Sequence, residues 1–156
     1  ALTDYETGGS CSVGTIEGGT FTNVVPQECV ITVDIRVPDM ETGDEIMAIF
    51  EGLEAVDPDC SLEVTGGVDR PAYEKFDGIA KLFDQAKEIA AEIGFDLQDM
   101  KTGGGSDGNF TGALGIPTLD GLGADGKGAH THDEFIYYSS LEDRAKLMLG
   151  LFEALD

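Results

Sequence analysis

The two histidines of the chain lie in one short segment, residues 128–134, which reads Gly-Ala-His-Thr-His-Asp-Glu. The whole chain has 31 acidic and only nine basic residues. Imidazole is the commonest protein ligand of a catalytic divalent metal. His130 and His132 are two positions apart, so they would point the same way in an extended chain. An open zinc site needs about three protein ligands, so this segment predicts one edge of a metal site. The alternative is a pair of solvated loop histidines.

A run of three glycines, residues 103–105, follows a predicted strand. Glycine lets a backbone approach a ligand closely, and successive N–H groups in such a loop can form a nest for an anion. No lysine follows at the spacing of a phosphate-binding loop. The run therefore favours carboxylate binding over phosphate binding, with a plain tight turn as the alternative.

Two further polar residues suit the recognition of an anion. Arg70 stands in Asp-Arg-Pro, where two differently patterned parts of the chain meet, and its planar guanidinium matches a carboxylate. An ion pair between domains is the other interpretation of Arg70. Asn23 falls in a short connection between two predicted strands, where its amide could bind an anion or cap the turn. Taken alone, Asn23 favours the turn.

Elements of two kinds must position these residues. The first seventy residues predict strand, strand, helix and strand, and a full ferredoxin-like layer would need one more strand and one more helix. The clearest predicted strand is residues 29–37, in which apolar residues alternate with the others. From residue 71 onward, helices alternate with short strands, which is typical of a separate α/β layer. The predicted strands are residues 11–16, 29–37, 61–68, 96–101 and 116–122, and the predicted helices are 43–54, 76–93 and 139–155.

The predicted helices carry specific expectations about burial. The first has an apolar stripe of Ile46, Ile49, Phe50 and Leu53. The second should end at Gly94, and its apolar residues recur at steps of three and four: Phe76, Ile79, Phe83, Ala86, Ala90 and Ile93. In the last, Ser139 and Glu142 have the spacing of a capping box. That helix is expected to bury Leu141, Ala145, Met148, Phe152 and Leu155.

Composition limits the partners of the protein. A net charge of −22 argues against nucleic acid and anionic membranes, because phosphate neutralisation needs clustered Lys and Arg. No apolar run approaches the ~20 residues of a bilayer span, and the chain opens without a signal-peptide pattern. It also opens without Met, so we expect a processed protein or a piece of a longer one. Cys11, Cys29 and Cys60 are odd in number and lack close metal-type spacing. They are expected to be small buried residues in a reduced, cytoplasmic setting, with a disulfide as the alternative.

Four segments in order resemble one protein family. They are residues 14–26 (Gly-Thr-Ile-Glu-Gly-Gly-Thr-Phe-Thr-Asn-Val-Val-Pro), 68–72 (Val-Asp-Arg-Pro-Ala), 102–108 (Thr-Gly-Gly-Gly-Ser-Asp-Gly) and 128–135 (Gly-Ala-His-Thr-His-Asp-Glu-Phe). Together they are similar to the co-catalytic zinc metallopeptidases that include glutamate carboxypeptidase, acetylornithine deacetylase and succinyl-diaminopimelate desuccinylase. None of the four is specific alone, but the ordered set spans nearly the whole chain.

The resemblance implies a fold and a chemistry. Residues 1–71 would be the later part of a ferredoxin-like α+β lid domain through which subunits form a homodimer. Residues 72–156 would be the C-terminal part of a zinc-exopeptidase α/β catalytic domain. Two zinc ions per subunit would share a bridging carboxylate and a water, whose hydroxide attacks the amide of a small peptide or N-acyl amino acid.

The resemblance also assigns individual residues. His130 matches the last zinc ligand, Asn23 and Arg70 match positions that hold the free carboxylate of the substrate, and Gly104 matches a backbone N–H that joins them. His132 matches no functional position and is expected on the surface.

The family's other zinc ligands, its bridging Asp and its general-base Glu belong to an upstream segment that this chain lacks. We therefore expect the complete protein to be a glutamate-carboxypeptidase-like metallopeptidase or amidohydrolase, and the 156 residues to hold zinc poorly and to be inactive. The alternatives are a non-catalytic recognition and dimerisation fragment, or an anion-binding module that uses residues 103–105.

Overall fold

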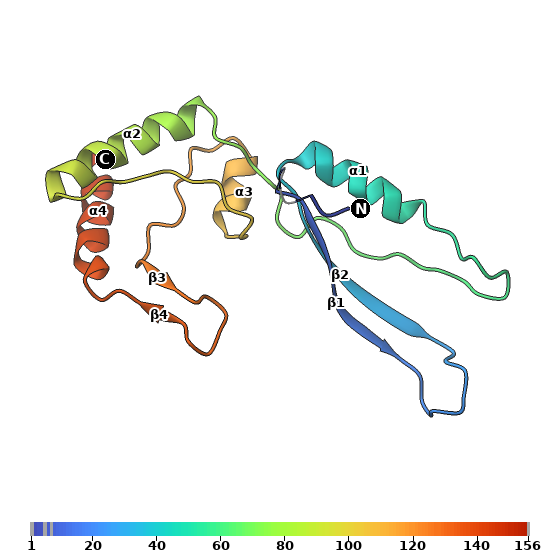
Figure 1. Cartoon of the computed structure of the whole chain (residues 1–156). Helices are drawn as coiled ribbons and strands as arrows, with labels where there is room; N and C mark the ends of the chain where they lie inside the picture. Colours follow the sequence, from blue (N-terminus) through green and yellow to red (C-terminus); the bar gives the residue numbers. More distant parts are fainter. Residues whose placement is uncertain (1, 5, 7, 156) are drawn as a thin grey trace. The chain divides into compact units, whose positions relative to one another are not determined.

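The chain forms two compact units (Figure 1). The computed structural model describes residues 2–4, 6 and 8–155. The first unit comprises Ala1–Tyr73 together with Gly103–Gly105, and the second comprises Glu74–Thr102 and Ser106–Asp156. Helices and small sheets make the protein a mixed α/β protein. Over the described residues, the helices are too short or too polar to cross a membrane. The assignment of residues 1–71 to a lid domain and 72–156 to a catalytic domain stays a prediction.

The first unit is built on a β-hairpin. Strands β1 (Ser10–Gly18) and β2 (Cys29–Arg36) are antiparallel, and the pairing runs from Ser10 opposite Arg36 to Gly18 opposite Cys29. Its register shifts between Val13 and Thr15. The alternating pattern that predicted β2 is confirmed.

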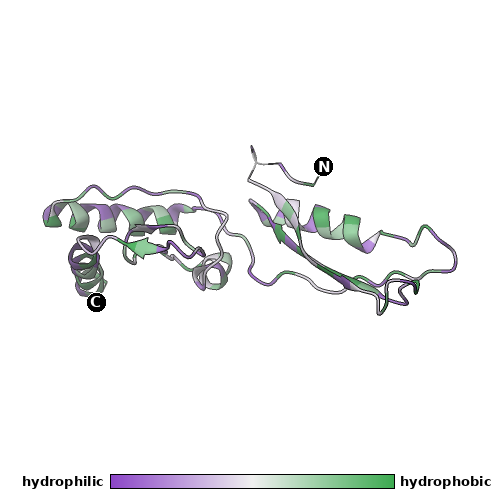
Figure 2. Ribbon diagram, turned by 60° about the horizontal axis from the view of Figure 1, so that its bottom comes forward, coloured by the Kyte–Doolittle hydropathy of each residue, from purple (hydrophilic) through white to green (hydrophobic). Residues whose placement is uncertain are grey.

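Helix α1 (Met40–Glu51) follows the hairpin and begins at Asp39, whose carboxylate accepts a hydrogen bond from Thr42 N at 2.8 Å. This is an ordinary side-chain N-cap. Figure 2 shows apolar residues along the later turns of the helix, and Ile46 is buried. The rest of the expected stripe is less covered, with Ile49 and Leu53 each 49% exposed, because a two-stranded sheet offers little surface to pack against.

The prediction of a strand at residues 61–68 is wrong for this structure. The segment is irregular, and its apolar residues Leu62, Val64 and Val68 are 40–54% exposed. A strand needs a hydrogen-bonded neighbour, and the hairpin forms its own two-stranded sheet.

The second unit has its core between two helices. The contact joins α2 (Asp77–Ile93) and α4 (Ser140–Ala154). A Cβ on Gly150 would lie 2.7 Å from a methyl of Ile89, so glycine allows the helices to approach this closely. The predicted stripe and end of α2 are confirmed, since Gly94 takes a left-handed conformation and donates to Ala90 O. The buried core residues are Ala86, Ala90, Leu97, Leu147 and Leu151.

The predicted face of α4 is wrong. Leu147 and Leu151 are buried, whereas Leu141, Met148, Phe152 and Leu155 are 40–67% exposed. The helix carries two apolar stripes, and α2 covers the one beside Gly150.

The predicted capping box at the start of α4 is also absent. Ser139 has a helical backbone and no side-chain capping bond. The carboxylate of Glu142 pairs instead with Lys146, one turn along, at 2.6 Å.

The remaining elements of the second unit differ from the sequence expectations. Residues 96–101 and 116–122 are not strands. Leu97 belongs to the core, and Leu119 and Leu122 pack against it from irregular segments. Three short elements were not predicted: α3 (Gly108–Ala113), β3 (Gly126–Lys127) and β4 (Phe135–Ile136), of which β3 and β4 pair antiparallel.

The three cysteines are free thiols, as expected, but their expected burial is wrong. Cys11 is half-buried, and Cys29 and Cys60 are exposed. Cys29 is the first residue of β2, and Cys60 lies in the irregular segment after α1.

Candidate functional site

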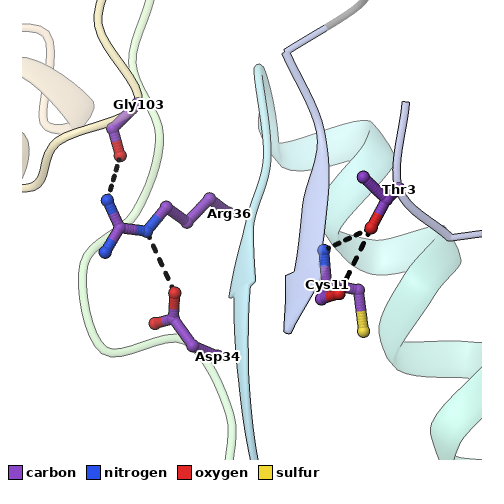
Figure 3. A network of polar contacts seen from close by, with 5 residues as sticks. All are labelled: Thr3, Cys11, Asp34, Arg36 and Gly103. Atoms are coloured by element: carbon purple, nitrogen blue, oxygen red, sulfur yellow. Dashed lines mark hydrogen bonds and ion pairs between the residues drawn. The ribbon is translucent and has the colours of Figure 1, made fainter. Parts of the chain in front are cut away.

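An arginine that the sequence analysis did not select contacts the glycine run. Arg36 is the last residue of β2, and its Nη1 donates to the carbonyl oxygen of Gly103 at 3.3 Å (Figure 3). Its Nε donates to the carboxylate of Asp34, two residues earlier on the same face of the strand, at 3.0 Å. The side chain of Arg36 remains 55% exposed. The end of β2 therefore presents a guanidinium beside residues 103–105.

Arg70, which the sequence did select, lies against the same run. A Cβ built on Gly105 would be 3.0 Å from Arg70 Cδ and 3.9 Å from Nε. Such a contact is tighter than side chains normally make, so glycine at 105 lets the arginine lie against the backbone. Arg70 also donates from Nη1 to Asp69 at 2.8 Å and is 42% exposed.

We call Arg36, Arg70 and Gly103–Gly105 the arginine–glycine cluster. Gly104, the residue predicted to offer its N–H, is the middle of the run. Two guanidiniums and a side-chain-free backbone suit a planar anion. The ion pairs that each arginine makes are exposed, and exposed pairs contribute about 0–1 kcal/mol. A bound carboxylate could therefore replace Asp34 or Asp69 at little cost.

Asn23 does not join the arginine–glycine cluster. It lies exposed in the loop between β1 and β2, in a turn closed by Val24 N donating to Phe21 O at 3.2 Å. Arg36 lies at the opposite end of the hairpin, and eight strand residues at ~3.3 Å each separate the two ends by about 25 Å. Asn23 thus occupies a turn, and its role in binding stays a prediction.

His130 lies in the second unit, in the loop between β3 and β4. Its backbone φ is 66°, and it is the one non-glycine residue with positive φ among those described. Non-glycine residues seldom adopt this conformation, and such outliers cluster at functional sites. His130 and His132 are both exposed.

The loop around His130 is closed by its own polar groups. Thr131 N donates to Gly128 O at 3.0 Å, and the hydroxyl of Thr131 donates to the same oxygen at 2.7 Å. The N–H of His130 donates to the carboxylate of Glu134 at 3.3 Å. The histidine is thus carried by a compact, internally bonded loop.

His130 fits one position of a divalent-metal site, because an exposed imidazole on a bonded loop is an ordinary ligand. The described residues contain no group of three or more His, Cys, Asp and Glu side chains that could hold a metal ion. His130 is therefore one candidate ligand and not a complete site.

By comparison with known proteins, the chain is similar to hydrolases of the metallopeptidase class. The model of the family described as peptidase family M20/M25/M40 matches residues 5–154. The chain belongs to this family.

Two curated relatives support the assignment. Uncharacterized protein YqjE of Bacillus subtilis (strain 168) is 34% identical over 154 residues, which cover 96% of this chain and 40% of that protein. Carboxypeptidase G2 of Pseudomonas sp. (strain RS-16) is 28% identical over 143 residues, which cover 86% of this chain and 34% of that protein. The chain thus spans well under half the length of either relative.

Arg36 is the residue of the cluster that sequence reasoning missed. A polar residue at this position is what the alternating pattern of a half-buried strand requires, so the pattern does not distinguish Arg36 from an ordinary surface residue. Its contact with Gly103 joins positions 67 residues apart. The one available signal was its place at the last position of the strand, in a chain with few basic residues.

Proposed function

We propose that this chain is the substrate-recognising portion of a di-zinc metallopeptidase of the M20 family. The complete protein would cleave the amide bond of small peptides or N-acyl amino acids that carry a free carboxylate, in the manner of a glutamate carboxypeptidase. Membership of the family and the similarity to a protein named a carboxypeptidase support the reaction class.

The observation that carries the proposal is the arginine–glycine cluster. The bond from Arg36 to Gly103 and the close packing of Arg70 on Gly105 place two arginines, each in an exposed ion pair, at one exposed backbone segment. In a chain with net charge −22, such a pairing of arginines favours a local, specific role in anion recognition.

His130 is proposed as one zinc ligand, with the other ligands supplied by residues outside this chain. Zinc, when bound, lowers the pKa of its water and stabilises the negative charge that develops on the attacked carbonyl oxygen. The residues of this chain would contribute binding and orientation: the cluster holds the substrate's carboxylate, and the loop of residues 128–134 presents the imidazole.

The test is hydrolysis by the complete enzyme of an N-acyl amino acid and of its C-terminal amide, with metal content measured in parallel. We expect the free carboxylate to be strongly preferred and His130→Ala to lower the bound metal and the activity together. His132→Ala is the matched control and should change neither. Full metal content and activity in His130→Ala would contradict the proposal.

A second candidate is a non-catalytic recognition and dimerisation fragment. It is favoured by the lack of a three-ligand metal group among the described residues. Both roles predict only weak binding of Zn²⁺ to the isolated 156-residue chain in a calorimetric titration, so the activity and metal content of the complete protein separate them. Two tight zinc sites on the isolated chain would show that these residues complete a metal centre by themselves.

Self-association through residues 1–71 is also proposed. It would explain how Asn23, about 25 Å from the cluster along the hairpin, could serve a carboxylate site, because the turn of one copy could reach the cluster of another. Asn23→Ala tests this role: it should raise KM for free carboxylates if Asn23 binds them, and change nothing if the residue only shapes the turn.

A further inference from the structure

The loop that carries His130 contains a turn whose geometry can be reversed by one peptide flip. Thr131 N donates to Gly128 O, so Ala129 and His130 are the two central residues of a β-turn. A positive φ at the second central residue, 66° at His130, occurs when the central peptide points as it does in type II turns. Flipping that peptide gives a type I turn and a negative φ at the same position.

Histidine is an unusual residue at this position. Type II turns favour glycine or asparagine there, because a side chain makes positive φ unfavourable. Left to local preference, the turn around His130 would take the type I form. Something else in the loop must hold the observed orientation.

The group that does so is the carboxylate of Glu134. The central peptide of the turn carries the N–H of His130, and this N–H donates to Glu134 Oε2 at 3.3 Å. A flip would turn the N–H away and break the bond. The rest of the loop holds Glu134 in reach, because Glu134 N donates to Thr131 O at 3.3 Å and Asp133 N donates to the hydroxyl of Thr131 at 3.2 Å.

We infer that Glu134 is a positioning residue, which fixes the peptide orientation at His130 and thereby the direction in which the imidazole leaves the loop. The functional half of this inference rests on the proposed role of His130 as a metal ligand. The structural half concerns only the loop and does not require a metal.

The structural test is NMR spectroscopy of the 156-residue chain. The contact between the Ala129 Hα and the His130 amide proton is short in the observed orientation and long after the flip. We expect this contact to be strong in the parent chain and lost in Glu134→Ala, with faster exchange of the His130 amide. Glu134→Gln keeps an acceptor oxygen and should restore the contact, and Asp133→Asn removes a neighbouring charge and should leave it unchanged.

A double substitution separates positioning from general damage to the loop. Glycine favours positive φ, so His130→Gly should keep the turn in its present form even when Glu134 is alanine. A strong Ala129–His130 contact in Glu134→Ala alone would overturn the inference, as would loss of the contact in the His130→Gly, Glu134→Ala double variant.

The functional test measures metal affinity of the complete enzyme by chelator competition. Removal of supporting hydrogen bonds around a ligand typically weakens metal binding by 10–100-fold, and we expect about a tenfold loss in Glu134→Ala and a smaller one in Glu134→Gln. If His130→Ala leaves metal affinity intact, the proposed function fails whatever the NMR result. If His130→Ala abolishes binding and Glu134→Ala does not weaken it, the positioning role alone fails.

Discussion

Replacement of Arg70 by alanine should reduce selectivity for substrates with a free carboxylate. Arg70 lies against Gly105, and its guanidinium, with that of Arg36, is a candidate partner for an anion on the glycine run. Hydrogen bonds to charged groups contribute about 1.5–3 kcal/mol. Because Arg70 is 42% exposed, we take a value near the lower end, about 2 kcal/mol, which corresponds to roughly a 30-fold loss in kcat/KM.

The assay compares a free-carboxylate substrate with its amide in the complete enzyme. Arg70→Ala should raise KM for the acid by about the factor above and leave the amide almost unaffected, because the amide carries no charge for the arginine to bind. Arg70→Lys keeps the charge but loses the planar fork and should fall between the two. Arg144→Ala is the matched control: that side chain lies over the ring of Phe95 and has no place in the cluster, so its loss should leave the acid-to-amide ratio unchanged.

One result would refute the reasoning. Equal losses for the acid and the amide in Arg70→Ala would show that Arg70 acts through its ion pair with Asp69 and not through the substrate. Arg36→Ala provides an independent measure, since its contact with Gly103 predicts a loss of the same kind.

Three further predictions concern the fold and its assembly. Leu147 is fully buried, so Leu147→Ala should lower the free energy of unfolding by about 2–5 kcal/mol, whereas Leu149→Ala, at a position 58% exposed, should cost far less in the same denaturant titration. The hydrogen bond and charge of Lys75 lower the pKa of Asp99. The pair therefore stabilises the folded state above the ordinary carboxyl pKa, and this stabilisation is lost as pH falls through the lowered pKa of Asp99. Asp99→Asn should remove this part of the acid dependence of unfolding, and an unchanged dependence of stability on pH would contradict the prediction. Residues 1–71 should self-associate more strongly as salt screens the net charge of −22, and light scattering that finds a monomer at high salt and high concentration would show the hairpin edges to be protected.

The sequence predicted the elements whose pattern is set by local contacts. The alternation of β2 and the stripe of α2 are periodic over their full length, and both elements form where expected. The predicted strands failed for a physical reason: residues 61–68, 96–101 and 116–122 have apolar residues, but a strand also needs a neighbour, which composition does not supply. The helix α4 has two apolar stripes, and the buried one contains Leu147 and Leu151, beside the close approach of Gly150 to Ile89, which the apolar pattern alone does not predict.

Sequence reasoning also found some residues of the candidate site and missed others. Arg70, the glycine run and His130 belong to short motifs with unusual residue types, so sequence reasoning could select them. The grouping of Arg36 with Gly103 depends on a contact across 67 positions. The positive φ of His130 accompanies a hydrogen bond from its N–H to a side chain four residues later. Neither contact has a local signature.

The ion pair between Arg70 and Asp69 leads to a prediction of tighter substrate binding, opposite in direction to the one for Arg70→Ala. In the free chain Asp69 occupies one edge of the Arg70 guanidinium at 2.8 Å, while being 87% exposed itself. A substrate carboxylate must share or displace this partner, so Asp69 competes with the substrate. Exposed pairs of this kind contribute about 0.2–1 kcal/mol. Asp69→Asn should therefore lower KM for free-carboxylate substrates by about 1.4-fold to fivefold, with no change for amides. The effect should shrink as salt weakens the competing pair. A rise in KM for the free-carboxylate substrate would mean that Asp69 orients the guanidinium of Arg70 for binding. The prediction that the two carboxylates compete would then be wrong.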